Sequence, residues 1–169
     1  MAIVGTPSQT AGPLWGFALM FDGCEHAVDP SDPDAIRVEG MIVDGADEPF
    51  GYPDSFVEVW QGGQFARART DEQGRYSVTV AKPEPVALPD GRIQAPHLNV
   101  SVFGRGLLKQ AQTRLYFPDE GAANEEDPVL QLVDPDRRSS LIARADGGGL
   151  RFDIRLQGDR ETETVFFDF

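Results

Sequence analysis

The sequence predicts an all-β protein built as a β-sandwich or barrel. Short stretches of alternating apolar and polar residues recur along the chain, turn residues separate them, and long helix-period stretches are absent. Glycine and proline are plentiful, at 18 and 13 residues, as short strands joined by tight turns require. With 169 residues, 40 % of them hydrophobic, the chain has the length for a full core. We therefore expect one domain over residues 1–169.

The first part of the chain predicts an irregular arm followed by a strand. Residues 1–35 are rich in Pro, Gly and Asp, which favours irregular structure. The first strand pattern is "IRVEGMIVDG", and we expect the Asp44-Gly45 dipeptide to close it in a turn of positive φ. In "SFVEVWQ" (55–61), Val57 and Val59 alternate with bulky or polar neighbours, which predicts a second strand.

Two further strands follow from the same period of two. The segment "ARTDEQGRYSVTV" places Asp71 and Gly74 in a turn, and then Tyr76, Val78 and Val80 on one strand face. In "HLNVSVFG" (97–104), three apolar side chains alternate with a second set. Leu98, Val100 and Val102 are expected to point inward, and the set on the other face is His97, Asn99, Ser101 and Phe103.

The C-terminal third predicts the clearest strand and one helical turn. In "LRFDIRLQG" (150–158), apolar residues alternate with charged ones, as in a strand with one solvated face, and we expect an antiparallel sheet there. Near "EEDPVLQLV" (125–133), Asp127 is a suitable cap and Pro128 suits the first position of a helical turn.

Charge and cysteine content exclude several classes of function. The formal net charge of −13 repels phosphate backbones, so nucleic acid is not an expected partner, and an anion site would need a local arginine. The single cysteine, Cys24, has no base beside it and favours an inert thiol in a cytoplasmic protein. The N-terminus has neither a signal-peptide pattern nor a long apolar run, so we expect a soluble protein without membrane contact.

Eight segments together resemble the intradiol ring-cleaving dioxygenases, most closely the alpha subunits of the protocatechuate 3,4-dioxygenases. They are in family order and span nearly the whole chain. The segments are "TPSQTAGP" (6–13), "VEVWQ" (57–61), "TDEQGRYSVTVAKP" (70–83), "QAPHLNVSVFGRGLL" (94–108), "TRLYFPDE" (113–120), "DPVL" (127–130), "RFDIRLQG" (151–158) and "ETVFFDF" (163–169). The resemblance implies a mixed β-sandwich core with long connecting arms.

Catalytic members of this family hold a non-haem ferric iron with two tyrosines and two histidines, the latter from a His-x-His strand. Here the first histidine position is His97, but the second is Asn99, a poor ligand beside imidazole. Val86 follows "KPEP" where the family has one tyrosine, and the short loop "GGQFARA" (62–68) lacks the other. We therefore expect this chain to bind no iron. His97 is interpreted as a relic of a ligand position, now packed or hydrogen-bonded.

The resemblance also implies a partner and a reaction. An Fe(III)-bearing beta subunit would carry the metal, and this chain would contribute Gly12, Pro13 and Arg105 to the shared substrate pocket. Gly allows close backbone approach, Pro offers an apolar edge, and Arg can bind an aromatic carboxylate. The complex would insert both atoms of O₂ into protocatechuate, giving 3-carboxy-cis,cis-muconate in the β-ketoadipate route of aromatic degradation.

Simpler interpretations remain open for each of these residues. Arg105 could be a surface or subunit-contact residue, and Gly12-Pro13 an ordinary turn. The whole chain could be a transthyretin-like binding or scaffolding module, since "TDEQGRY" also occurs there, whereas a self-contained enzyme site has little support.

We expect Trp60 and Tyr76 to be core anchors, Tyr116 to be core or interface, and Arg137, Arg138 and Arg144 to form a basic patch. The aromatic tail "ETETVFFDF" should be covered by another subunit or by the sandwich.

Overall fold

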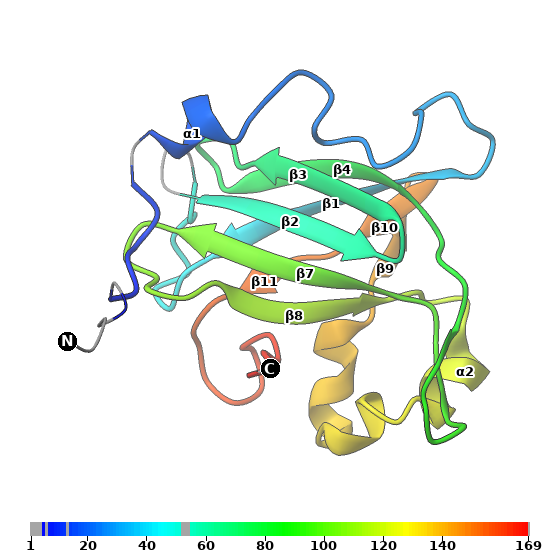
Figure 1. Cartoon of the computed structure of the whole chain (residues 1–169). Coiled ribbons are helices and arrows are strands. Elements are labelled where there is room, and N and C mark those ends of the chain that lie inside the picture. Colours follow the sequence, from blue (N-terminus) through cyan, green and yellow to red (C-terminus); the bar gives the residue numbers. More distant parts are fainter. Residues whose placement is uncertain (1–4, 6, 13, 52–54, 169) are drawn as a thin grey trace.

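Two β-sheets packed face to face form the centre of the molecule (Figure 1). The computed structural model describes all residues except 1–4, 6, 13, 52–54 and 169. The predicted all-β class and the mixed sandwich are confirmed. The single-domain organisation stays a prediction. Within the described part of the chain, no helix has the length and apolar character needed to cross a membrane.

The first sheet is mixed and is organised around one central strand, β1 (Ala35–Val43). On one side, β4 (Arg75–Ala81) pairs with β1 in antiparallel fashion. On the other side, β10 (Gly149–Arg151) and β11 (Ile154–Arg155) pair with β1 in parallel. The short strand β9 (Arg144–Asp146) is antiparallel to β10.

The segment 150–158 differs from its prediction in two ways. It is not one continuous strand, because Phe152 and Asp153 separate β10 from β11, and its pairing with β1 is parallel. At the break, the Asp153 carboxylate accepts a 3.0 Å hydrogen bond from the backbone N–H of Met41, in place of a backbone carbonyl. A side chain thus interrupts the ladder, which local alternation of residues does not reveal.

The second sheet is wholly antiparallel, with strand order β3-β2-β7-β8. Its strands are β2 (Ser55–Gln61), β3 (Gln64–Arg69), β7 (His97–Gly104) and β8 (Ala111–Tyr116). Only Gly62 and Gly63 connect β2 to β3, and Gly62 adopts a φ of 58°, which glycine accepts without strain. Of the short loop expected over 62–68, only these two glycines form the connection, because the residues from Gln64 onward belong to β3.

The remaining elements are short and lie outside the sandwich. The arm contains one helical turn, α1 (Trp15–Ala18), and β5 (Val86–Ala87) pairs with β6 (Ile93–Gln94). Between β8 and β9 lie α2 (Gly121–Glu126) and two 3-10 turns, η1 (Leu130–Leu132) and η2 (Pro135–Leu141).

Asp127 caps a turn as expected, and its role is wider than the sequence indicates. One carboxylate oxygen accepts hydrogen bonds of 2.8 Å from the N–H groups of both Val129 and Leu130. The other accepts one of 2.8 Å from the N–H of Ala95, next to β7. Pro128 was expected at the first helical position. In the structure, Val129 is the N-cap residue and η1 begins at Leu130, two residues after Pro128.

The turn after β1 also departs from its prediction. The positive φ falls on Asp47, at 63°, rather than on the Asp44-Gly45 dipeptide. The Asp44 carboxylate accepts hydrogen bonds from the N–H groups of Ala46 and Glu48, which wraps the chain around this side chain. The left-handed residue therefore comes two positions after Gly45, the second residue of the dipeptide.

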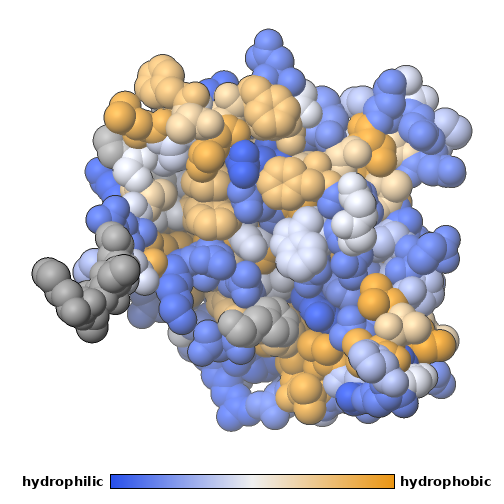
Figure 2. All heavy atoms as spheres, in the orientation of Figure 1, coloured by the Kyte–Doolittle hydropathy of each residue, from blue (hydrophilic) through white to orange (hydrophobic). Residues whose placement is uncertain are grey.

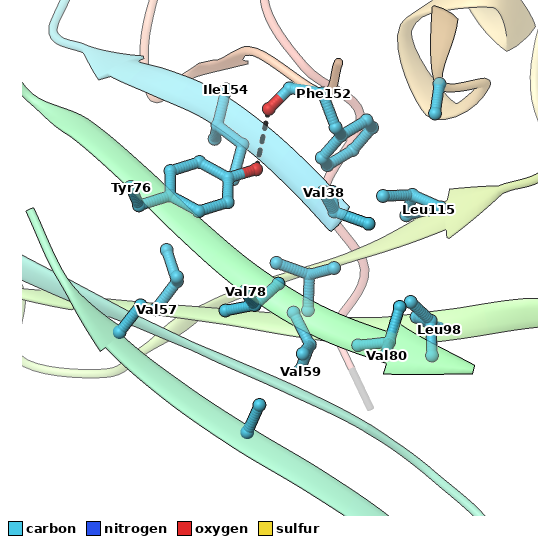
Figure 3. Packing of buried hydrophobic residues seen from close by; sticks show 14 of the residues in the cluster. Val38, Val57, Val59, Tyr76, Val78, Val80, Leu98, Leu115, Phe152 and Ile154 are labelled. Atoms are coloured by element: carbon cyan, nitrogen blue, oxygen red, sulfur yellow. Dashed lines mark hydrogen bonds between the residues drawn. The ribbon is translucent and has the colours of Figure 1, made fainter. Parts of the chain in front are cut away.

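The core lies between the two sheets and is filled by side chains from both (Figure 3). Tyr76 is buried there as expected, and its hydroxyl donates a 2.6 Å hydrogen bond to the carbonyl oxygen of Phe152. The prediction that Trp60 anchors the core is wrong, because its side chain is 43 % exposed. Successive side chains of a strand point to opposite faces, so burial of Val59 places Trp60 on the outer face.

The C-terminal tail packs back onto the sandwich. The Thr113 hydroxyl donates to the carbonyl oxygen of Val165 at 2.7 Å, and the N–H of Phe167 donates to the carbonyl oxygen of Gln112 at 2.8 Å. Phe166 packs against the main core. The tail was expected to be covered either by another subunit or by the sandwich, and in the structure the sandwich covers it.

Candidate functional site

His97, the remaining histidine of the ligand pattern, is sealed within the protein. Its side chain is 1 % exposed, and its Nδ1 atom lies 2.8 Å from the carbonyl oxygen of Ala95. A carbonyl oxygen only accepts hydrogen bonds, so Nδ1 carries the proton. The Nε2 atom then has a lone pair, and it lies 3.0 Å from the amide Nε2 of Gln61, which donates to it. Both ring nitrogens are thus used within the chain.

The surroundings of His97 keep its ring neutral. Burial lowers the pKa of His97, and the nearby Arg114 guanidinium acts in the same direction. The hydrogen bond to Ala95 and the charge of Asp127 oppose this shift, but burial has the largest effect on the pKa. A neutral, fully hydrogen-bonded imidazole is a packed core residue.

Asn99, at the second histidine position, faces an arginine rather than a metal. In the antiparallel register of β7 and β8, Asn99 lies opposite Arg114. The Asn99 amide donates a 3.4 Å hydrogen bond to the carbonyl oxygen of Trp60, and the Arg114 guanidinium donates one of 3.3 Å to the hydroxyl of Tyr116. A permanent cation beside the former ligand face opposes the binding of another cation.

The described tyrosines are also unsuited to bind iron. Tyr116 is buried in the core, and its hydroxyl donates to Asp127 at 3.1 Å. Burial raises the pKa of Tyr116 and that of Tyr76, which disfavours the phenolate form that ferric iron requires. Among the described residues, no group of three or more His, Cys, Asp or Glu side chains is arranged to hold a metal ion. The residues that the structure describes do not fit a ferric iron centre.

Arg105 lies at the other end of β7 from His97. The strand has eight residues, so its two ends are separated by roughly 23 Å at about 3.3 Å per residue. Arg105 is exposed and occupies the second position of a turn, which the N–H of Leu107 closes onto the carbonyl oxygen of Gly104 at 3.2 Å. Gly106 has a φ of 94°, as the third position of a type II turn demands.

The N-terminal arm lies against this same turn. The Oγ1 atom of Thr10 accepts a 2.7 Å hydrogen bond from the N–H of Gly106 and donates one of 3.3 Å to the carbonyl oxygen of Gly104. Gly12 is exposed two residues further along the arm. The structure thus brings the Gly12 segment and Arg105 to one end of the second sheet, whereas Pro13 falls outside the described residues.

A groove of about 400 Å³ lies between the arm and the second sheet at this end. Arm residues 9–11 and residues 107–110 after the turn form its two sides, and Phe56 and Phe103 contribute to its lining. Beyond it, Leu14, Phe17 and Phe21 are exposed on the arm, with Phe17 at 88 %. Figure 2 shows apolar side chains gathered over the α1 end of this face. An exposed apolar surface of this kind marks a contact site for another protein.

The three arginines expected to form a basic patch each make a different contact within the chain. Arg137 donates to the carbonyl oxygen of Glu163 in the tail, and Arg138 donates to the carbonyl oxygen of Val133. Arg144 of β9 pairs with Asp153, in the break between β10 and β11. These residues stabilise the chain's own fold, which favours neither a substrate nor an anion site there.

Comparison with known proteins decides the family. A protocatechuate 3,4-dioxygenase alpha chain from Pseudomonas putida is 39 % identical, with 97 % of this chain and 96 % of the relative aligned. A second alpha chain, from Burkholderia cepacia, is 36 % identical over 96 % of both chains. This chain belongs to the protocatechuate 3,4-dioxygenase alpha chain family. It is thus a subunit of an intradiol dioxygenase, an oxidoreductase, and the binding-module alternative is not favoured.

Solved structures of similar fold agree with this family. The dioxygenase domain of a dioxygenase and carbohydrate-binding fusion from Streptomyces sp. SirexAA-E has a TM-score of 0.59 at 22 % identity, covering 83 % of this chain and 88 % of that one. Hydroxyquinol 1,2-dioxygenase from Pseudomonas putida DLL-E4 has a TM-score of 0.57 at 15 % identity, covering 92 % and 63 %. At such identities the likeness concerns the fold alone. No protein-family model matches the chain.

The family alignment also shows that this chain is short. The alignment with the Pseudomonas putida relative extends over 197 positions, more than the 169 residues present here. The relative therefore contains segments that this chain lacks. In this chain, only two residues connect β2 to β3.

Proposed function

We propose that this chain is the non-catalytic alpha subunit of a protocatechuate 3,4-dioxygenase and completes the active site of an Fe(III)-bearing beta subunit. Two observations together support this proposal. The chain aligns over nearly its whole length with alpha chains of this enzyme, while its described residues offer no ligand set for iron. A chain that belongs to a metal-dependent enzyme family but does not fit the metal would act beside a partner that binds it.

The alpha subunit's contribution would come from the end of the sandwich where the arm meets the Arg105 turn. Arg105 is exposed at the tip of that turn, and Gly12 is exposed on the arm tied to it. The substrate, protocatechuate, carries a carboxylate, and this chain carries a net charge of −13. A guanidinium placed locally at the pocket would offset the repulsion and donate charge-assisted hydrogen bonds to the carboxylate.

The backbone around Gly12 and Pro13 would complete the pocket wall. A glycine lets the chain approach a ligand closely, and the proline ring offers a rigid apolar edge to an aromatic ring. The exposed apolar side chains of the arm, Leu14, Phe17 and Phe21, would be covered by the beta subunit, which would exclude water from the pocket.

In the complete enzyme, Fe(III) held by the beta subunit would activate the catechol toward O₂. The reaction would cleave the ring between the two hydroxylated carbons, and the product would be 3-carboxy-cis,cis-muconate. The tasks of this chain would be to hold the substrate carboxylate and to shield the pocket. A cytoplasmic location is part of the same proposal, because this route of aromatic degradation and a single unpaired cysteine both suit it.

Co-expression with the beta subunit tests this function. We expect a stable complex with iron bound, and O₂ uptake with protocatechuate that is much faster than for either subunit alone. The measurements are size-exclusion chromatography, iron content and O₂ consumption on one preparation. A beta subunit that is fully active alone, and forms no complex with this chain, would instead favour the scaffolding or binding module.

A further inference from the structure

A single hydroxyl group connects the arm to the turn that carries Arg105. The hydrogen bonds from Thr10 reach the backbone of Gly104 and Gly106, the two residues that flank Arg105, across more than 90 positions of sequence. Thr10 was not singled out from the sequence, where it is one residue of the "TPSQTAGP" segment. Its contacts make it the residue on the described arm that holds both sides of the Arg105 turn.

The chemistry of the turn explains why a hydroxyl fits there. In the turn from Gly104 to Leu107, the closing hydrogen bond uses the N–H of Leu107 and the carbonyl oxygen of Gly104. The N–H of Gly106 takes no part in that closure, and the Thr10 oxygen accepts it at 2.7 Å. A hydroxyl both donates and accepts through one oxygen atom, so it can hold a carbonyl and an N–H that lie close together.

A second contact fixes the arm beyond Gly12. The ring of Trp15 lies 4.7 Å from that of Phe56, and Phe56 stacks on Phe103 at 4.7 Å with an interplanar angle of 4°. Trp15 is buried by this packing. Gly12 therefore lies between two fixed points of the arm, the Thr10 hydroxyl on one side and the Trp15 ring packing on the other. A segment ordered before its partner arrives loses less conformational entropy on binding.

We propose that Thr10 is a positioning residue, which holds Gly12 and the Arg105 turn in one fixed arrangement for the shared pocket. The proposal rests on the proposed function and deepens it. Thr10 would act through the backbone of its neighbours, without touching the substrate. The effect of removing it should therefore appear in how Arg105 is presented, rather than in the metal content of the enzyme.

Three variants of the full chain, each purified with the beta subunit, test this role. Thr10→Val keeps the branched shape and removes the hydroxyl, Thr10→Ser keeps the hydroxyl, and Ser8→Ala is a control at an exposed hydroxyl of the same arm. In Thr10→Val, amide hydrogen exchange of peptides spanning 104–107 should become roughly three- to tenfold faster, the range that loss of such hydrogen bonds gives. Thr10→Ser and Ser8→Ala should match the wild-type exchange rate.

Steady-state kinetics supply the functional measurement. For Thr10→Val, kcat/KM for protocatechuate should fall about tenfold with iron content and complex size unchanged, and Thr10→Ser should restore it. In an Arg105→Ala background, Thr10→Val should have little further effect, because both changes act on the same contact. A purely structural role would lower the melting temperature without this dependence on Arg105.

The possible results distinguish failure of the positioning role from failure of the proposed function. Unchanged exchange and kinetics in Thr10→Val, or effects that add fully to those of Arg105→Ala, would overturn the positioning role. Loss of the complex in Thr10→Val with unchanged kcat/KM in the remaining complex would overturn it in favour of an assembly role. An inactive wild-type complex would refute the proposed function, whereas faster exchange at 104–107 in Thr10→Val would still support the tie between arm and turn.

Discussion

The Nε2 atom of His97 lies 3.0 Å from the amide nitrogen of Gln61, so the one histidine left in the ligand pattern is occupied by a neighbouring strand. Its other ring nitrogen is bound to the carbonyl oxygen of Ala95. A metal bound at Nε2 would have to displace the Gln61 amide, and it would then find Asn99 and the Arg114 guanidinium on the same sheet face. The packing around His97 thus disfavours iron at this position, as the residue types do.

The first prediction concerns iron. The chain purified without its partner should bind no stoichiometric Fe(III), and it should lack the visible absorption of iron bound to tyrosinate. The reason is that Asn99 and Val86 replace donors, and Tyr76 and Tyr116 are buried with their hydroxyls bonded internally. Elemental analysis and a visible spectrum check it, with the complex containing the beta subunit as the loaded control. A coloured, iron-loaded single chain would contradict it.

The second prediction concerns pH. Burial lowers the pKa of His97 below its usual value of 6.5, so the folded state favours the neutral ring. The stability that this provides is complete above pH 6.5, and it is lost as the pH falls through the lowered pKa, because the unfolded chain then binds more protons. The charged and titratable groups that face His97 are Arg114, Asp127 and Tyr116.

Urea unfolding of the wild type and of His97→Gln at pH 7.5 and pH 5 checks this effect. Glutamine does not titrate, so the stability advantage of the wild type over the variant should shrink at pH 5. The carboxylates of the chain are common to both proteins and cancel in the comparison. An advantage that stays constant between the two pH values would show that His97 does not titrate across the folding transition.

The third prediction concerns Gly40, where β1 passes closest to the break between β10 and β11. A Cβ atom added at Gly40 would lie 1.8 Å from the carbonyl oxygen of Phe152 and 2.7 Å from the Tyr76 hydroxyl. Gly40→Ala should therefore destabilise the protein by about 3 kcal/mol or more, through overpacking and loss of a buried hydrogen bond.

Two variants calibrate that measurement in denaturant unfolding. Tyr76→Phe removes only the hydrogen bond to Phe152 and should cost about 1–3 kcal/mol. Gly16→Ala, in α1, meets no heavy atom within 4 Å and should change the free energy of unfolding by about 1 kcal/mol or less. Equal effects of Gly40→Ala and Gly16→Ala would refute the steric argument.

The fourth prediction concerns Arg105 in the complex with the beta subunit. Arg105→Ala should lower kcat/KM for protocatechuate roughly ten- to a hundredfold, the effect of losing a charge-assisted hydrogen bond made in the transition state. Iron content and complex size should stay unchanged. Arg92→Ala, which removes an exposed cation in the loop between β5 and β6, away from this turn, is the control and should have little effect. Parallel loss of assembly and activity in Arg105→Ala would assign Arg105 to the subunit contact instead.

The strands that sequence pattern predicted best are those whose burial follows simple alternation. In β2 and β7, Val57, Val59 and Val100 are buried as expected, because each faces the core through its own position in the strand. The segment 150–158 has an equally regular pattern, yet it breaks into two strands. The reason is a contact between Asp153 and Met41, which are 112 residues apart.

The sequence by itself determined the family resemblance and the loss of the iron ligands, because ligand chemistry depends on residue types such as Asn99 and Val86 at known positions in a motif. Only the tertiary structure decided how His97 is occupied and that Thr10 joins the arm to the Arg105 turn. Those contacts are made by single polar atoms between segments 36 and 96 residues apart. Hydrogen bonds depend on position to within a few tenths of an ångström, and folding alone brings such distant atoms to that precision.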